Sequence, residues 1–395
     1  MLISLVGIVC ILACGLLLSH NRRAISTRTV LSGLVLQIAL AVCLLKTAGG
    51  ISAVAIIAQG VSNLYSYARV GSQFLFGDLG NPMGPWGFIF AVNVLPMIIF
   101  FGAFMAVLFW AGIIQSVVQV LAWGVRPLLG TSGAETLCAV ANSFLGQTEA
   151  PLVIRQYLKN MTKSELFVVM VSGMATISGA ILAVFVAMGV PAEHLLAASV
   201  MAIPASIVMA KLVVPETENS ETACNSVTVQ KNSDKLLGAI SQGTTDGLQL
   251  AVNVAAMLIS FLALLALLNG VLGYIYPELS LERIVGIICY PFALFLGFTG
   301  TEAFTVAQLL GTKVAINELI AYKNMLDAHL SERTVSIVTY ALCGFSNISC
   351  IGIQIGGIGA LVPEKREWLI ELGWYAVITA ALANLLSATI VAILI

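Results

Sequence analysis

Two glutamates stand in stretches of this chain that are otherwise apolar. Glu149 ends the string Gly-Gln-Thr-Glu at 146–149, and Glu318 ends the string Lys-Val-Ala-Ile-Asn-Glu at 313–318. A carboxylate at bilayer depth costs roughly 2.5–3.5 kcal/mol on insertion scales, so it usually faces a cavity and marks a substrate or ion path. Amide or hydroxyl side chains lie beside each glutamate. The two strings therefore predict a polar ligand held within a membrane.

The composition supports a membrane setting. Of the 395 residues, 59% are hydrophobic and only 9% are charged, with a mean hydropathy of +1.01; soluble domains carry about 25% charged residues. The chain has room for about ten membrane passages. A net charge of −1 argues against a nucleic-acid partner. The 8 cysteines form no CxxC or Cys/His pattern, so we expect no disulfide framework, metal cluster or other cofactor.

Apolar windows of about 19 residues predict the membrane spans. The first, at 2–18, is followed rather than preceded by arginines, which indicates a retained helix instead of a signal peptide. Residues 47–87 contain Gly, Ser and Asn with scattered aromatics and predict an interfacial, partly helical segment. Residues 214–246 are the most polar stretch and predict a solvated linker between two halves. Further spans are expected at 29–46, 88–122, 166–189, 192–213, 247–275, 333–361 and 368–395.

Two more apolar regions, 132–160 and 285–325, are broken in the middle by Gly and polar residues. Each has the length of two short helices and a turn, which is typical of a re-entrant hairpin; the second turn is expected at 298–302. Broken backbone is tolerated at membrane depth only where protein or a water-filled cavity satisfies it. Two such hairpins leave eight full passes and place both termini outside. Most of the 18 Lys and Arg then lie in cytoplasmic segments, in agreement with the positive-inside rule.

The two hairpins carry similar strings in the same order. Gly-Gln-Thr-Glu-Ala at 146–150 matches Gly-Thr-Glu-Ala at 300–303, and Gly-Met-Ala-Thr-Ile-Ser at 173–178 matches Gly-Phe-Ser-Asn-Ile-Ser at 344–349. Chance similarity among Gly/Ala/Ser-rich segments is the alternative explanation. Three passes separate the hairpins, so the two units must have opposite orientation. Inverted repeats with interrupted helices are typical of secondary transporters.

Two other functional classes fit the sequence less well. An intramembrane enzyme needs a nucleophile and base, or metal ligands, at membrane depth, yet the chain has no HExxH motif and its three histidines lie near segment ends. A channel needs a continuous polar lining, whereas the polar residues here cluster in the two hairpins and in the strings 173–178 and 344–349. We therefore expect a transporter and not an enzyme.

The strings at 146–151, 311–318 and 341–347 together resemble the concentrative nucleoside transporter family, in its short bacterial form, over essentially the whole chain. The resemblance implies an all-α polytopic membrane protein with eight spanning helices and two re-entrant hairpins, assembled as a homotrimer. It also implies a transport domain that moves against a fixed trimer scaffold. We divide the chain accordingly into N-terminal helices 1–130, transport repeat 131–213, linker and long scaffold helix 214–282, and transport repeat 283–395.

The resemblance also implies the substrate contacts. Gln147, Thr148 and Glu149 at the first hairpin tip would contact the base, since amides and hydroxyls pair with its donors and acceptors. Glu318, on the returning arm of the second hairpin, and Asn347, at the break in the next helix, would hold the sugar. Phe345 would supply an apolar face, and Cys350 stands where relatives often have a serine that touches the ribose. A thiol is a weaker hydrogen-bonding group than a hydroxyl, so contact at Cys350 is in question. The alternative for all these groups is that they only satisfy broken helices.

Residues of the first hairpin and of the span after it indicate which ion is coupled to transport. Sodium prefers oxygen ligands, and sodium-coupled relatives place an asparagine four residues before the hairpin glycine and a hydroxyl at the following helix break. Those positions are Asn142 and Thr176 here, with the carbonyls of Leu145 and Ile177 beside them. Asn142 favours Na⁺ over H⁺, although it also suits a helix cap. Glu302 could line an outer vestibule or face water, and Lys313 is given a structural role.

The sequence thus predicts a cation-coupled symporter, with Na⁺ favoured, that imports nucleosides across the cytoplasmic membrane by an elevator-like mechanism. A proton-coupled nucleoside symporter and a carrier of another small polar solute are the alternatives. The expected partners are the nucleoside, Na⁺ or H⁺, the lipid bilayer and two further copies of the chain. The sequence does not distinguish purine from pyrimidine nucleosides.

Overall fold

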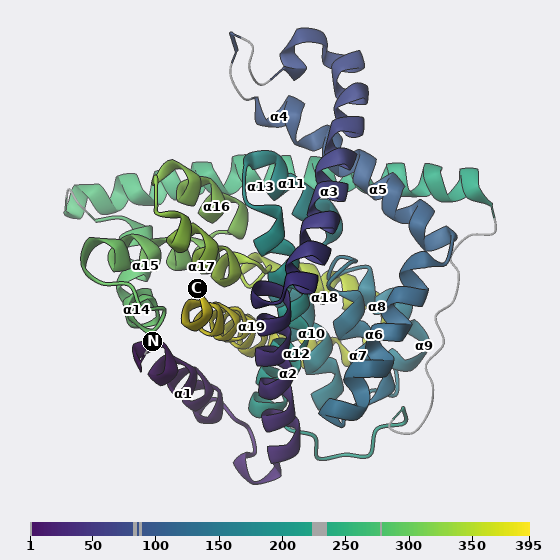
Figure 1. Ribbon diagram of the computed structural model, residues 1–395, viewed down its shortest axis with the longest axis vertical. Coiled ribbons are helices and arrows are strands. Elements are labelled where there is room, and N and C mark those ends of the chain that lie inside the picture. Colours follow the sequence, from purple (N-terminus) through teal and green to yellow (C-terminus); the bar gives the residue numbers. More distant parts are fainter. Residues whose placement is uncertain (1, 82–84, 87–88, 223–234, 277–278) are drawn as a thin grey trace.

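Helices form every regular element in the part of the chain that the computed structural model describes, residues 2–81, 85–86, 89–222, 235–276 and 279–395. Their arrangement is shown in Figure 1. In chain order they are α1 (Leu2–Leu17), η1 (Arg22–Ala24), α2 (Thr27–Lys46), α3 (Ala48–Phe76), η2 (Gly77–Gly80), α4 (Phe90–Asn93), α5 (Leu95–Trp110), α6 (Ile113–Leu129), α7 (Gly133–Ala141), α8 (Ala150–Val153), α9 (Arg155–Leu158), α10 (Lys163–Ala175), α11 (Gly179–Met188), α12 (Ala192–Val213), α13 (Leu236–Ile275), α14 (Leu281–Phe295), α15 (Gly300–Ala315), α16 (Glu318–Asp327), α17 (Glu332–Leu342), α18 (Ser349–Leu361), η3 (Pro363–Lys365) and α19 (Arg366–Leu394).

Seven of the helical stretches in the described residues are long and apolar enough to cross a membrane, or eight if the bent pair α14–α15 counts as one span. This agrees with the predicted class and with about eight passes. The segment expected at 47–87 to be interfacial and without a span contains one of the seven, Ala48–Gly80, so that prediction was wrong. The spans expected at 2–18 and 333–361 are not among the seven, because α1 is too short and α17 ends before α18 begins. The span expected at 88–122 is interrupted at Ala111 and Gly112, where α5 ends and α6 begins.

The long helix α13 begins earlier than predicted. It spans 40 residues from Leu236, so the predicted polar linker 214–246 is helical over its last part, and residues 223–234 of it lie outside the described residues. In Figure 1 α13 runs across the molecule and crosses the direction of α2 and α3. It packs on α5 at glycines: a Cβ on Gly102 would come within 2.7 Å of the Gly243 carbonyl oxygen. Small residues let the two backbones approach closely.

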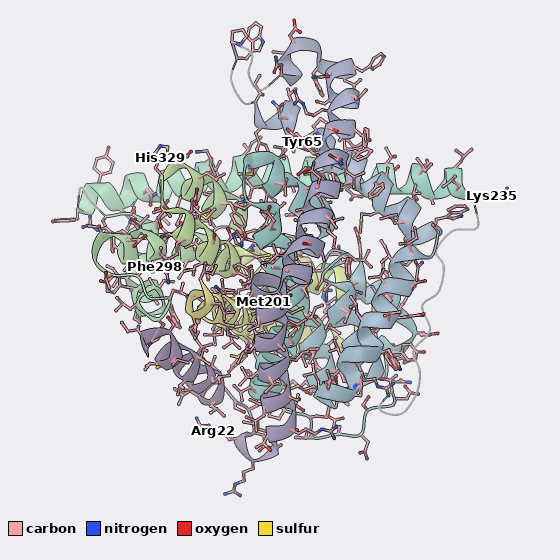
Figure 2. All side chains as sticks on the ribbon, in the orientation of Figure 1. Arg22, Tyr65, Met201, Lys235, Phe298 and His329 are labelled. Atoms are coloured by element: carbon pink, nitrogen blue, oxygen red, sulfur yellow. The ribbon has the colours of Figure 1, made fainter. Side chains whose placement is uncertain are left out.

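The core lies around α10, α12 and α19, whose apolar windows are 78–89% buried within the molecule, in contrast to 6% for α13. Met201 of α12 is completely buried and lies near the centre of the molecule in Figure 2. The helix α1 packs between α14 and α19, since Gly7 faces Phe295 and Thr389. Both chain ends therefore lie close together, as Figure 1 shows.

The order of helices repeats along the chain, but one of the two sequence matches is out of register. The elements α6, α7, α8–α9, α10, α11 and α12 are followed by α14, α15, α16, α17, α18 and α19 in the same pattern. Gly300 begins α15 as Gly133 begins α7, so the counterpart of the break at 142–149 is 316–317 and not 298–302. The match of Gly146 with Gly300 was therefore wrong. The downstream match holds, because 176–178 and 343–348 both interrupt a helix pair.

The predicted turn at 298–302 does exist, but it joins other helices. There α14 and α15 meet at a bend of 119°, and Gly300 adopts a φ of 59° that favours glycine. Glu302 follows this turn and accepts a hydrogen bond from the Thr334 hydroxyl at the start of α17. This contact gives Glu302 a local partner that neither sequence-based alternative included.

Candidate functional site

The centre of the molecule contains four interruptions of helices. Two follow α7 and α15, and two divide α10 from α11 and α17 from α18. Thr176 at the third break is extended, with φ −117° and ψ 170°, and Ser178 then caps α11. Phe345 at the fourth break donates its backbone N–H to the Thr176 carbonyl at 3.3 Å. The breaks of the two repeats therefore lie against each other.

Gln147 connects the first hairpin to α18. Its Nε2 donates to the Cys350 sulfur at 3.2 Å, and its Oε1 accepts from Gln354 Nε2 at 3.1 Å. Gln354 is completely buried and also donates to the Met170 carbonyl at 3.0 Å. A Cβ on Gly173 of α10 would lie 3.0 Å from the Gln147 Cβ and 2.9 Å from Gln354 Nε2. The hairpin tip can approach α10 this closely only because residue 173 is glycine.

The next two residues of the tip point outward from this contact. Thr148 and Glu149 are exposed, whereas Gln147 is buried. The Thr148 methyl group lies against Gly357 of α18, where an added Cβ would come within 3.0 Å of it. One Glu149 carboxylate oxygen accepts the Gly146 N–H at 3.5 Å, and its other oxygen is free for a donor from outside the described chain. A hydroxyl and a carboxylate are thus presented side by side.

Glu318 and Asn347 meet at the second pair of breaks. Asn347 Nδ2 donates to Glu318 Oε2 at 2.9 Å, and both residues are buried. The Asn347 Oδ1 atom accepts from the Ser349 hydroxyl at 2.6 Å and from the Cys350 N–H at 3.1 Å. Asn317 caps α16 by accepting the Ile320 N–H at 2.9 Å, which fixes the place where Glu318 enters the site.

Asn142 and Thr176 also lie together, next to Ser172 of α10. Asn142 Nδ2 donates to the Ser172 hydroxyl at 2.9 Å, and the Thr176 hydroxyl donates to the Asn142 carbonyl at 3.0 Å. Asn142 is 1% exposed, yet its Oδ1 has no donor among the described residues. Among the described residues, no backbone N–H donates to the carbonyl oxygens of Leu145 or Ile177 either. Buried oxygens without donors are costly, and oxygen ligands are what a hard cation prefers.

The structure therefore brings most of the predicted residues into two adjoining groups and leaves Thr148 and Glu149 exposed beside the first. Gln147 and Cys350 touch each other, Glu318 touches Asn347, and Asn347 touches Cys350. The second group is Asn142 and Thr176, and Phe345 is linked to it because its backbone N–H donates to the Thr176 carbonyl. Three further polar residues lie here that were not predicted: Ser172 contacts Asn142, Gln354 contacts Gln147, and Asn384 contacts the Ala175 and Cys343 carbonyls at the ends of α10 and α17. All three are lone hydrogen-bonding side chains inside apolar helices, a signal that could have identified them.

Gly344 offers a first testable prediction about this centre. Its φ is 156°, and a Cβ there would lie 2.6 Å from Asn384 Oδ1 and 2.7 Å from the Ala175 carbonyl oxygen. We expect Gly344→Ala to lower the stability of the detergent-solubilised protein by about 1–3 kcal/mol, as overpacking does in a close-packed core. Gly352→Ala on α18 is the matched control, since nothing lies within 4 Å of its added Cβ. Thermal unfolding compares the two; equal melting temperatures would contradict the crowding.

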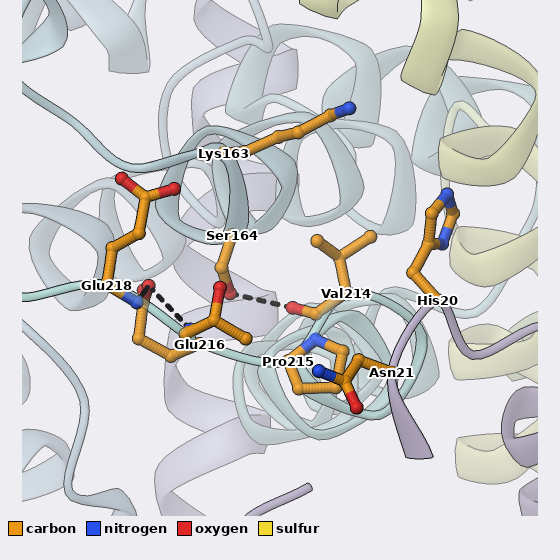
Figure 3. A pocket seen from close by; sticks show the side chains of 9 residues that line it. His20, Asn21, Lys163, Ser164, Val214, Pro215, Glu216 and Glu218 are labelled. Atoms are coloured by element: carbon orange, nitrogen blue, oxygen red, sulfur yellow. Dashed lines mark hydrogen bonds between the residues drawn. The ribbon is translucent and has the colours of Figure 1, made fainter. Parts of the chain in front are cut away.

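A separate polar pocket lies where α1, α10 and α12 end or begin, and Figure 3 shows it from close by. The Ser164 hydroxyl donates to the Val214 carbonyl at 2.7 Å and accepts from Lys211 Nζ at 3.0 Å. Beneath it Lys211 pairs with Glu135 of α7 at 2.7 Å. This ion pair holds the first hairpin arm to α12. The pocket contains none of the predicted substrate or ion residues; it is lined by His20, Asn21, Lys163, Ser164, Val214, Pro215, Glu216, Thr217 and Glu218.

Comparison with known proteins connects this geometry to one family. Residues 6–79 and 194–392 match the models described as Na+ dependent nucleoside transporter N-terminus and C-terminus, and residues 91–192 match the model described as nucleoside recognition. The nucleoside permease NupC of Helicobacter pylori is 38% identical over 98% of this chain and 96% of its own length. Sodium/nucleoside cotransporter 1 of Rattus norvegicus is 37% identical over 100% of this chain and 64% of its own.

A solved structure agrees with the sequence relatives. CNTnw in an inward-facing substrate-bound state superposes with a TM-score of 0.94 at 39% identity, covering 99% of this chain and 98% of that one. A doubly substituted variant of CNTnw has been solved in an outward-facing state, again with a TM-score of 0.94 to this chain, at 38% identity. The matched proteins are multi-pass membrane transporters and not enzymes. This chain therefore belongs to the concentrative nucleoside transporter family, whose family descriptions specify sodium-dependent carriers.

Proposed function

We propose that this protein is a Na⁺-coupled symporter that imports nucleosides across the cytoplasmic membrane, with both termini outside. The observation that carries the proposal is the contact chain that joins the two hairpins. Gln147 reaches Cys350, Cys350 reaches Asn347, and Asn347 reaches Glu318. These residues come from opposite halves of the chain, so a ligand held by both halves would couple their positions.

A nucleoside fits the chemistry of the two ends of this chain of contacts. At one end Gln147, Thr148 and Glu149 offer an amide, a hydroxyl and a carboxylate for the donors and acceptors of a base. At the other end Glu318 accepts and Asn347 donates or accepts, as ribose hydroxyls require. Phe345 provides an apolar neighbour on the same break. The Cys350 sulfur accepts a hydrogen bond from Gln147 Nε2 at 3.2 Å; because a thiol hydrogen-bonds more weakly than a hydroxyl, we expect it to contribute little to sugar binding.

The coupling ion belongs, in this proposal, between the first hairpin and the α10–α11 break. Asn142 Oδ1 supplies a buried oxygen with no donor among the described residues, and Leu145, Thr176 and Ile177 supply further oxygens on the same two breaks. Oxygen ligands are what a hard cation prefers. An ion there would order residues 142–149 and so fix the tip that presents Gln147, Thr148 and Glu149.

The movement would be elevator-like, with the two hairpins and their following helices as the moving part. The part proposed to stay fixed contains α5 and α13, which pack tightly through Gly102, Gly243 and Gly247. Along α13 large apolar side chains remain exposed, as expected where lipid and two further copies in a homotrimer would cover them; examples are Leu237, Val252, Ile259, Leu264, Leu267 and Val271.

Uptake into cells that lack nucleoside carriers tests the proposal. We expect accumulation of labelled uridine or adenosine that stops when external sodium is replaced by choline at fixed pH. A panel of unlabelled nucleosides competing with uridine would then define selectivity. Uptake that persists in choline but collapses with the proton gradient would assign a proton-coupled symporter. A correctly inserted protein that moves no nucleoside would point to another small polar solute.

A further inference from the structure

Lys313 is a buried cation that contacts only neutral oxygens. It is 2% exposed, and its Nζ donates to the Ala341 carbonyl at 2.8 Å and to Asn384 Oδ1 at 2.7 Å. The ion pairs between described residues do not include Lys313, so Glu318, five residues onward, does not neutralise it directly. Removing an ammonium group from water is expensive unless its surroundings replace the lost hydration. Burial therefore makes the charged form of Lys313 costly, and the two oxygens only partly replace the lost hydration.

The oxygens around Lys313 belong to the ends of interrupted helices. Ala341 lies in the last turn of α17. Asn384 of α19 donates through Nδ2 to the Ala175 carbonyl at 2.7 Å and to the Cys343 carbonyl at 2.8 Å. Those two carbonyls stand at the ends of α10 and α17, where helix dipoles place partial negative charge. A positive charge on Lys313 would therefore offset the partial negative charge at the place where α10 and α17 end.

The helix order repeats, and Lys313 lies in the second repeat near the place that Asn142 and Thr176 take in the first. Asn142 directly follows α7 and lies beside the break after α10; Lys313 is in the last turn of α15 and lies beside the break after α17. Because α7 and α15 hold the same place in the repeat, both residues lie at the C-terminal end of corresponding helices, with Lys313 three residues before Ile316, which directly follows α15. In the first repeat the Asn142 Oδ1 has no donor among the described residues, whereas in the second an ammonium occupies the oxygens.

We propose that the Lys313 ammonium is a tethered cation that takes, in the second repeat, the place that a coupling ion takes in the first. The expected consequence is stoichiometric: one sodium ion accompanies each nucleoside, because the Lys313 side chain already fills the second position. Lys313 would also hold the second hairpin arm against α17 and α19 and so keep Glu318 next to Asn347. This inference rests on the proposed function, since it assumes an ion site at Asn142.

Replacing Lys313 by serine, a small residue whose hydroxyl oxygen can bind an ion, tests this proposal. In Lys313→Ser the oxygens of Ala341 and Asn384 remain and space for an ion appears. We expect uridine uptake to fall about tenfold at low sodium, to recover at high sodium, and to show a Hill coefficient for sodium that rises from about one to about two. Lys313→Met offers no oxygen, so its uptake should stay low at every sodium concentration. Lys323→Ser is the control, because Lys323 forms an exposed pair with Asp327 on α16.

Several results would overturn the inference. Lys313→Ser with uptake and Hill coefficient equal to the parent would show that the charge is dispensable. An equal loss in Lys313→Ser and Lys313→Met at all sodium concentrations, with unchanged thermal unfolding, would show a purely structural role. If neither variant folds, the charge-to-nucleoside ratio of the parent protein decides: about one charge supports the inference and about two contradicts it. Uptake by the parent protein that does not depend on sodium would refute the proposed ion coupling. Even then, uptake by Lys313→Ser that newly depends on sodium would support the tethered cation.

Discussion

Replacing Glu318 by Gln should reduce nucleoside uptake by roughly ten- to hundredfold while leaving expression and oligomeric assembly intact. The carboxylate accepts a hydrogen bond from Asn347 at 2.9 Å, and in the proposed complex it also accepts from a ribose hydroxyl. Losing a charged acceptor costs about 1.5–3 kcal/mol, which corresponds to that range in affinity. Initial uptake rates of labelled uridine, normalised to the amount of protein in the membrane, measure the effect.

The companion change Glu149→Gln should cause a loss of the same order for a different reason. Glu149 is exposed at the hairpin tip and retains one carboxylate oxygen for the base. The matched control is Glu364→Gln, because Glu364 forms an exposed pair with Lys159 at 3.6 Å and exposed pairs contribute little. Near-normal uptake in both Glu149→Gln and Glu318→Gln would show that these acids only satisfy the broken helices.

Replacing Asn142 by Ala should weaken the apparent affinity for sodium by about tenfold or more. The substitution removes Oδ1, a buried oxygen that has no donor among the described residues, and it also removes the amide that donates to Ser172. A hydrogen bond or ligand to a charged group contributes about 1.5–3 kcal/mol. Asn160→Ala provides the control, since Asn160 is an exposed asparagine between α9 and α10. Uridine uptake as a function of external sodium at fixed pH gives the affinity.

The Asn142 substitution has a second, reciprocal consequence. If the ion orders the hairpin tip, sodium must tighten nucleoside binding by the same factor by which nucleoside tightens sodium binding. Asn142→Ala should therefore lower nucleoside affinity at low sodium and restore it at saturating sodium. A nucleoside affinity that falls equally at all sodium concentrations would separate Asn142 from ion binding. Unchanged sodium dependence would place the coupling ion elsewhere.

The sequence alone determined the class of the protein and the identity of its unusual residues. Uncompensated charge is expensive in a bilayer, so an apolar chain with acids at 149 and 318 indicates a membrane protein with a polar interior path. Helix breaks are also local features, because Gly, Pro and hydroxyl residues interrupt helices through their own backbone chemistry. A break within 132–160 was expected for this reason, whereas the breaks near Thr176 and Asn347 were implied by the family resemblance.

The tertiary structure decided what the breaks contact. Short strings of Gly, Thr, Glu and Ala recur by composition, so the sequence placed Gly300 opposite Gly146, whereas the order of packed helices pairs 142–149 with 316–317. Lys313 and Asn384 are 71 residues apart, and Gln147 and Gln354 are 207 apart. Such contacts leave no periodic trace in the chain, because they depend on which helix ends packing brings together. The sequence therefore determines that polar groups must be satisfied inside the membrane, and only the fold determines by which partners.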